Sequence, residues 1–148
     1  MTLLLDVFTI LSIGLMTGNE FAVSAFVNPA IWKLDDRAQV SLLARSLGRA
    51  MPFWYALNAI LLGVEAWLRS HTPGHLLLLS AELLWVATIV FTILLLVPIN
   101  NRLGADSEPD SDPGWRSAHK RWDILHRIRI AALTVAVICF LYGILQTA

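Results

Sequence analysis

The chain has 148 residues, of which 57% are hydrophobic, and its mean hydropathy is +0.65. This apolar content exceeds what the core of a soluble domain of such length requires, so the composition indicates an integral membrane protein. The formal net charge is zero, and the single cysteine, Cys139, excludes an internal disulfide and a CxxC redox pair.

Four apolar segments are long enough to cross the hydrocarbon core of a bilayer, which takes roughly 20 residues. The predicted helices cover residues 3–27, 50–68, 76–97 and 124–145. The prolines at segment ends or in connections, where a missing amide hydrogen is tolerated, are Pro29, Pro52, Pro73 and Pro98. We therefore predict one all-α membrane domain, a four-helix transmembrane bundle. A cleaved signal peptide is the competing interpretation of the first segment, but no basic stretch precedes it.

Lysine and arginine are distributed unevenly between the two sides of this bundle. Ten of the eleven lie in or beside the connections after the first and third segments, and only Arg69 lies on the other side. The positive-inside rule places these two loops in the cytoplasm and both termini outside. Topology and phospholipid headgroups account for the basic residues, so we expect the lipid bilayer as a partner and no nucleic acid.

The third connection, residues 101–121, is acidic and contains Pro109, Pro113 and Gly114, which predicts a flexible, solvated loop without chemistry. A short pattern also returns along the chain and indicates a weak internal repeat. At a constant offset of 69 residues, Pro29, Lys33 and Leu34 recur as Pro98, Arg102 and Leu103.

The first helix carries two stripes. The polar stripe, at spacings that place all members on one face of a regular helix, is Thr17, Glu20, Ser24 and Asn28. The small-residue stripe is Gly14, Gly18 and Ala22. We expect the small residues to pack against a neighbouring helix, either within the chain or in a homo-oligomer.

Polar residues at membrane depth are functional-site hypotheses, because each ionisable group there costs at least about 2.5 kcal/mol on insertion scales. By predicted depth they form two clusters. The cytoplasmic cluster comprises Glu20, Asn28, Asn58, Asn100, Asp123, His126 and Arg129, with Arg49 at its rim. The outer cluster comprises Glu65, Arg69 and Glu82, and we interpret it as a network at headgroup level.

The cytoplasmic cluster offers a carboxylate, an imidazole and a guanidinium, which suit proton transfer and oxyanion stabilisation. The alternative is a structural network in which Glu20 and Arg129 form a buried ion pair. Asp123-x-x-His126 is similar to the pattern of di-metal bundles, but the outer glutamates lie at the wrong depth to share an ion with it. A smaller metal site made of Glu20 and His126 remains an open alternative.

Several short motifs, in this order and spacing, together resemble one family. They are Gly18-Asn19-Glu20-Phe21, Phe26-Val27-Asn28-Pro29-Ala30, Arg49-Ala50-Met51-Pro52-Phe53, Pro98-Ile99-Asn100-Asn101-Arg102-Leu103 and Trp122-x-x-x-His126-x-x-Arg129. The chain is similar over nearly its whole length to the anthrone oxygenase-like family of small four-helix membrane proteins. It departs from the pattern at Asn28, where relatives often have histidine.

The resemblance implies oxidation of an anthrone to an anthraquinone by dioxygen, with no conventional organic cofactor. It implies that His126 or Glu20 acts as the base and that Arg129 and Asn100 hold the oxyanion, while Trp122 stacks on the substrate. The substrate would be a lipophilic aromatic or quinone-like molecule that enters from the bilayer. The alternative is a non-catalytic membrane protein, either a binding or transport subunit or an assembly partner.

Overall fold

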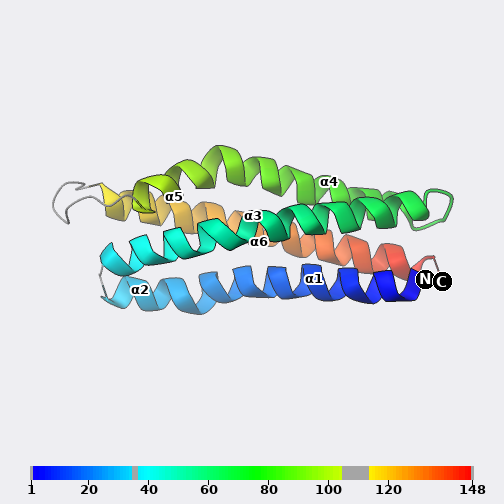
Figure 1. The fold of residues 1–148 in the computed structure, drawn as a ribbon, viewed down its shortest axis with the longest axis horizontal. Helices are drawn as coiled ribbons and strands as arrows, with labels where there is room; N and C mark the ends of the chain where they lie inside the picture. The colour runs from blue at the N-terminus through cyan, green and yellow to red at the C-terminus, as the bar shows by residue number, and fades with distance from the viewer. Residues whose placement is uncertain (1, 35–36, 105–113, 148) are drawn as a thin grey trace.

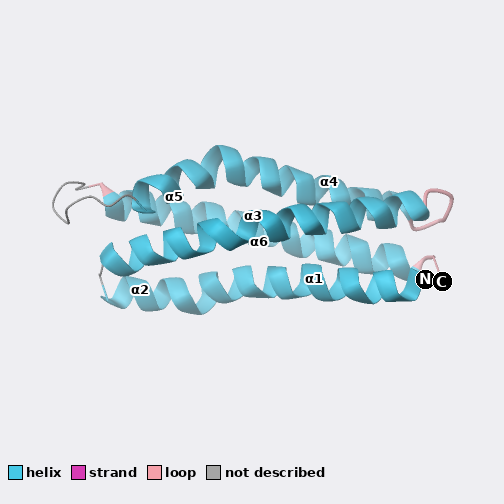
Figure 2. Cartoon of the chain, viewed as in Figure 1, coloured by secondary structure: helices cyan, strands magenta, loops and turns pink. Residues whose placement is uncertain are grey.

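The computed structural model describes the backbone of residues 2–34, 37–104 and 114–147, and the side chains of residues 3–33, 51–104 and 114–147. All the regular structure in these ranges is helical (Figure 2). In chain order the elements are α1 (Thr2–Ala22), the π-helical turn η1 (Val23–Val27), α2 (Asn28–Leu34), α3 (Arg37–Leu68), α4 (His75–Phe91), the π-helical turn η2 (Thr92–Leu96), α5 (Val97–Gly104) and α6 (Trp115–Leu145).

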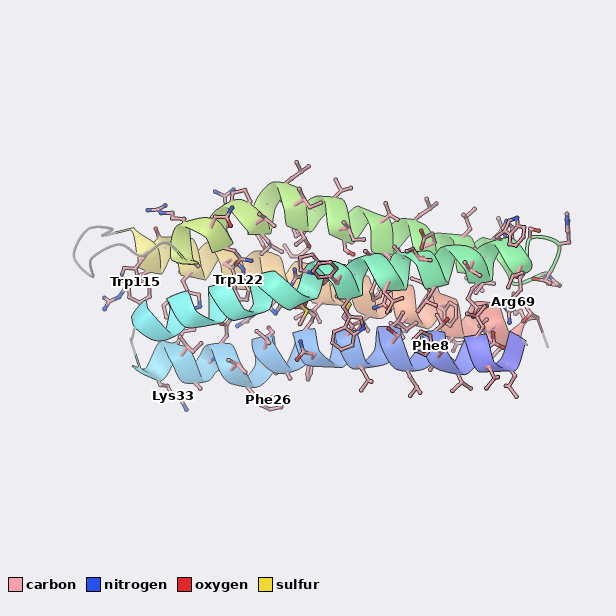
Figure 3. All side chains as sticks on the ribbon, viewed as in Figure 1. Phe8, Phe26, Lys33, Arg69, Trp115 and Trp122 are labelled. Carbon is pink, nitrogen blue, oxygen red and sulfur yellow. The ribbon has the colours of Figure 1, made fainter. Side chains whose placement is uncertain are left out.

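These elements form four continuous spans, each long and apolar enough to cross a membrane. The first span is α1–η1–α2, the second is α3, the third is α4–η2–α5 and the fourth is α6. Both termini lie at one end of the bundle, which we call the terminal end (Figure 1). Lys33 and Trp115 lie toward the opposite end, called the basic end (Figure 3). The predicted all-α bundle of four membrane-length helices is confirmed, whereas its sidedness stays a prediction.

The helices run further toward the basic end than hydropathy predicts. The first span continues to Leu34, and α3 begins at Arg37 instead of residue 50. Of the predicted loop 101–121, residues 101–104 belong to α5 and residues 115–121 to α6, while residues 105–113 lie outside the described residues. Hydropathy detects only the apolar part of a helix, so the polar turns beyond it were assigned to loops.

Pro29, Pro52 and Pro98 lie inside continuous helical spans and not at their ends, which corrects the prediction from the sequence. Pro29 and Pro98 each follow a π-helical turn by two residues. The amide of Asn28 donates to the carbonyl of Val23, and that of Val97 donates to the carbonyl of Thr92, five residues back in each case. The wider turn accommodates the proline ring and its missing amide hydrogen. The two turns lie 69 residues apart, so the repeated prolines have a repeated backbone feature.

The spans form a ring in which the first packs on the second and fourth, and the third packs on the same two. Near η2 the third span bows away from its neighbours (Figure 1). Two clusters of buried apolar side chains fill the interior, one around Trp85 and Phe140 and one around Leu96 and Trp122. Outside, Phe8 and Phe26 project from α1 and from η1 and are more than half exposed, as side chains facing lipid would be (Figure 3).

Glycines mark one close approach and one open surface. A Cβ at Gly74 would overlap the carbonyl oxygen of Gly143, so the start of α4 and the end of α6 touch at the terminal end. By contrast, a Cβ at Gly14 or Gly18 would meet nothing within 4 Å. The small-residue stripe therefore does not pack within the chain, because it faces outward. Homo-oligomerisation through this stripe stays a prediction.

Candidate functional site: a buried carboxylate beside a lipid-facing cavity

Glu20 lies at the centre of a buried network that joins three spans. Its side chain is 2% exposed. One carboxylate oxygen, Oε2, is 2.5 Å from Nη2 of Arg129 on α6, and the other accepts a hydrogen bond of 3.2 Å from the hydroxyl of Tyr55 on α3. The Nδ1 atom of His126 is 3.4 Å from Oε2. The structure thus brings together Glu20, His126 and Arg129, as the sequence predicted, and adds Tyr55.

Hydrogen bonding fixes the tautomer of His126. Its Nε2 is 3.1 Å from the backbone carbonyl oxygen of Glu20, which can only accept, so Nε2 carries the hydrogen. Its Nδ1 is 2.9 Å from Nη2 of Arg129, which can only donate, so Nδ1 is the acceptor. His126 is therefore neutral in this arrangement, with both ring nitrogens engaged.

The same geometry bears on the Glu20–His126 metal site considered from the sequence. Nη2 of Arg129 lies within hydrogen-bonding distance of both potential ligands, so a guanidinium occupies the place where the ion would sit. Across the described part of the chain, no three His, Cys, Asp or Glu side chains lie together as they would around a metal. The residues present fit an ion pair better than a metal centre.

A cavity of about 240 Å³ lies against this network, and all four spans contribute to its wall. Its lining residues are Glu20, Met51, Pro52, Tyr55, Ala56, Ile89, Thr92, Ile93, Val97, Asn100, Trp122 and Arg129. Most of the wall is apolar. Pro52 and Ala56 on α3 and Ile93 on η2 are exposed on the outside of the bundle, so the cavity opens between the second and third spans, toward lipid. The bow of the third span at η2 makes room for it.

The cavity lies deeper than the sequence predicted. Glu20 is 13 residues from Lys33 and 17 from Leu3, or about 20 Å and 26 Å along the helix at 1.5 Å per residue. It therefore lies near the middle of its helical span, farther from the span's end than the sequence predicted. The difference arises because the first span continues through Pro29 to Leu34, whereas the prediction ended it at residue 27.

Trp122 on the cavity wall belongs to a column of stacked rings on the inner side of α6. The rings of Trp122 and His126 are 4.5 Å apart with an interplanar angle of 14°, and those of Trp32 and His119 are 4.3 Å apart at 13°. His119 and Trp122 meet at a tilt, with centroids 6.4 Å apart. This packing fixes the Trp122 ring and covers one of its faces with His126.

Asn28 and Asp123 form a second polar group, nearer the basic end. The side-chain amide of Asn28 donates to Oδ1 of Asp123 at 2.9 Å, and its oxygen is 3.3 Å from Nε2 of His119. Asp123 also accepts from Arg127 at 2.8 Å. Neither Asn28 nor Asp123 lines the cavity, so the structure divides the predicted cytoplasmic cluster in two.

Other predicted members lie elsewhere. Asn58 accepts a hydrogen bond of 2.5 Å from Ser12 and does not line the cavity. Arg49 is in α3 but outside the residues whose side chains are described. Ser24 lines a shallow outer groove with Phe21, so it does not share the face of Glu20. The extra residue in η1 rotates the following positions, which brings Asn28 round to α6 and leaves Ser24 outside.

The outer cluster forms at the terminal end around Arg69, which contacts Glu65 as the i, i+4 spacing predicts. Asp6 and Thr147 join it. Glu82 does not complete this network as expected, because its Oε2 is buried with no hydrogen-bond partner among the described residues. Its side chain instead points toward Gly63.

Sequence reasoning missed Tyr55 and Thr92. Tyr55 donates to Glu20 and lies under the guanidinium of Arg129, whose carbon is 5.5 Å from the ring centroid. Thr92 accepts from Nη1 of Arg129 at 3.3 Å. One signal for Tyr55 is its spacing of three residues before Asn58, on the inner face of α3.

Comparison with known proteins identifies a family for this chain. The family model described as "Anthrone oxygenase" matches residues 40–139, more than half of the chain. No curated protein and no solved structure matches the chain.

Proposed function

The chain belongs to the anthrone oxygenase family, and from this premise we propose that it oxidises a flat, lipophilic aromatic molecule with dioxygen. The observation that carries the proposal is the position of Glu20, a buried carboxylate on the wall of an apolar, lipid-facing cavity. A cavity of about 150 Å³ is known to hold a benzene ring, so about 240 Å³ accommodates a larger aromatic system.

In this proposal Glu20 is the base. It lines the cavity, whereas His126 lies behind it with both ring nitrogens engaged. Tyr55 and His126 position the carboxylate and the guanidinium. Arg129 and Asn100 also line the cavity, where they stabilise negative charge on a substrate oxygen.

The reaction replaces a CH₂ group by a carbonyl group. Glu20 removes one C–H proton, which leaves an enolate whose oxygen is held by Arg129 and Asn100. The electron-rich carbon forms a C–O bond with dioxygen, and the resulting peroxide takes the proton back from Glu20. Loss of the second C–H proton and of hydroxide breaks the O–O bond, giving the quinone carbonyl and one water. No electrons are required beyond those of the substrate.

The test is oxygen uptake by the purified protein in lipid nanodiscs supplied with an anthrone. We expect one dioxygen consumed per anthraquinone formed, at a rate well above that of empty nanodiscs. Ala56→Trp fills the mouth of the cavity from an exposed position and should abolish most of the turnover, whereas Leu57→Trp, exposed on the same helix but outside the cavity lining, should not. Saturable binding of the anthrone without oxygen uptake would favour the non-catalytic carrier instead.

A further inference from the structure

A second hollow, the outer groove, lies on the outside of the bundle between the first span and α6. It has a volume of about 510 Å³ and a mostly apolar wall. On α6 its lining residues run from Arg127 to Thr134, seven residues or about 10 Å along the helix. Phe21, Ala25 and Pro29 contribute to it from the first span, and Arg127, Ala131 and Thr134 contribute from α6. The outer groove is therefore long, open and apolar, with an arginine toward the basic end.

Arg127 offers hydrogen-bond donors to a ligand on this outer surface. Its side chain is 62% exposed. Nη2 donates to Asp123 at 2.8 Å, four residues earlier in α6, so the side chain extends toward the basic end. The Asp123 carboxylate is only 12% exposed and also accepts a hydrogen bond from Asn28. The carboxylate is thus covered from outside, while the guanidinium, with five N–H donors, is open to an anion.

The surface of α6 changes character at Arg127. Lys120, Arg127 and Thr134 follow one another at intervals of seven residues, close to two helical turns, so they lie on one face. Toward the basic end this face carries the exposed Lys120. Toward the terminal end, from residue 128 to residue 145, the one charged side chain of α6 is Arg129, which is buried. The outer groove therefore starts at a cationic surface and continues along an apolar one.

The first span adds a second lysine at the level of Lys120. The rings of Trp32 and His119 stack at 4.3 Å, which aligns α2 with the first turns of α6. Lys33 and Lys120 directly follow these two residues, and both lysines are exposed. Together with Arg127 they make the surface next to the outer groove positive. An apolar groove beside clustered cations complements a molecule that joins an anionic head to an apolar chain.

We propose that the outer groove binds one anionic phospholipid of the bilayer, with an acyl chain along Ala25 and Ala131 and the phosphate on Arg127. A phosphate offers the oxygen acceptors that a guanidinium binds in pairs. A second copy of the chain fits less well, because a symmetric interface contains the same patch twice and would bring these cations together. The inference goes beyond the proposed function and does not depend on it, because the outer groove and the cavity share no residue.

Native mass spectrometry of the full chain tests the inference. The protein is released from detergent micelles that contain equal amounts of dioleoylphosphatidylglycerol, which is anionic, and dioleoylphosphatidylcholine, which is zwitterionic and has the same acyl chains. We expect one phosphatidylglycerol to be retained per chain, at an occupancy at least about tenfold above that of phosphatidylcholine. Equal retention of the two lipids would overturn the proposal, because it would show that the headgroup is not recognised.

Arg127→Gln should lower the retention of phosphatidylglycerol about tenfold and leave that of phosphatidylcholine unchanged, because it removes one charge-assisted contact. Arg121→Gln is the matched control, since it removes the same charge from an exposed position on the same helix, outside the outer groove. Equal losses in the two variants would show that the positive surface attracts the lipid diffusely, and would contradict a site at Arg127.

Ala131→Trp tests the acyl chain, because it fills the outer groove from an exposed position and keeps every cation. It should lower the retention of phosphatidylglycerol several-fold. Ala87→Trp, exposed on α4 and outside the outer groove, should not. Unchanged retention in Ala131→Trp would show that the chain lies elsewhere. A lipid-free dimer in the wild type that Ala131→Trp dissociates would assign the groove to a second copy, and would equally contradict the proposal.

Discussion

The described part of the bundle contains two buried pairs of arginine and glutamate, and they differ in what surrounds them. At the terminal end, each nitrogen of the Arg69 guanidinium donates: Nη1 to Glu65, Nη2 to Asp6 at 2.5 Å and Nε to Thr147 at 3.3 Å. At mid-length, Arg129 donates through Nη1 and Nη2, but its Nε has no partner among the described residues. The first pair is saturated and the second is not.

The two arginine–glutamate pairs also differ in where they lie in the bundle. Arg69 lies at the terminal end (Figure 3), where it ties Asp6 of α1 and Thr147, just beyond α6, to the end of α3. Glu20 and Arg129 line the lipid-facing cavity, whereas Glu65 and Arg69 do not. The role of a charged pair inside a membrane protein therefore depends on its unpartnered atoms and on its access to a cavity, and not on its residue types alone.

Arg69→Met should show the largest effect on stability. It leaves Glu65, which is fully buried, without its cation, and breaking a buried pair from one side costs about 3–5 kcal/mol. Unfolding in mixed detergent micelles measures the change. Arg127→Met is the control, because the Arg127 side chain is 62% exposed and its pair with Asp123 is worth at most about 1 kcal/mol. Turnover per folded molecule should be unchanged in both variants, and a specific loss of turnover in Arg69→Met would contradict the structural role.

Pro98→Ala should have a smaller effect than Arg69→Met, and we expect this effect on turnover. Alanine supplies the missing amide hydrogen, which allows η2 to tighten into a regular helix and moves Thr92 and Ile93 on the cavity wall. A displacement of this kind near the reacting groups costs about 10- to 100-fold in rate. Pro73→Ala, in the exposed turn before α4, should leave the rate unchanged. Wild-type turnover by Pro98→Ala would show that the π-helical turn does not shape the site.

Much of the architecture follows from the sequence because lipid imposes strong constraints. Apolar runs of membrane length predicted four spans, and the spacing of Trp122, His126 and Arg129 predicted one buried face of α6, which is a regular helix. The i, i+4 spacing predicted the Glu65–Arg69 pair for the same reason.

The predictions that were wrong or missing also have physical causes. Ser24 was placed on the face of Glu20 because periodicity assumes a regular helix, and the π-helical turn adds a residue. Tyr55 was not predicted as a site residue because a tyrosine within an apolar segment is usually interpreted as part of the hydrophobic core. The unpartnered donors of Trp122 and Arg129 depend on which neighbours each atom meets, which spacing along one helix does not contain.

The most direct test of the account compares Glu20→Gln with Glu65→Gln in the anthrone assay, with thermal stability measured in parallel. Both substitutions neutralise a buried glutamate that pairs with arginine, and both preserve its size. We predict that Glu20→Gln lowers turnover at least about 100-fold in a protein that still folds, as expected for loss of a general base. Glu65→Gln should unfold at a lower temperature yet keep wild-type turnover per folded molecule. Equal losses of turnover in the two variants, or full turnover by Glu20→Gln, would contradict the assignment of Glu20 as the base.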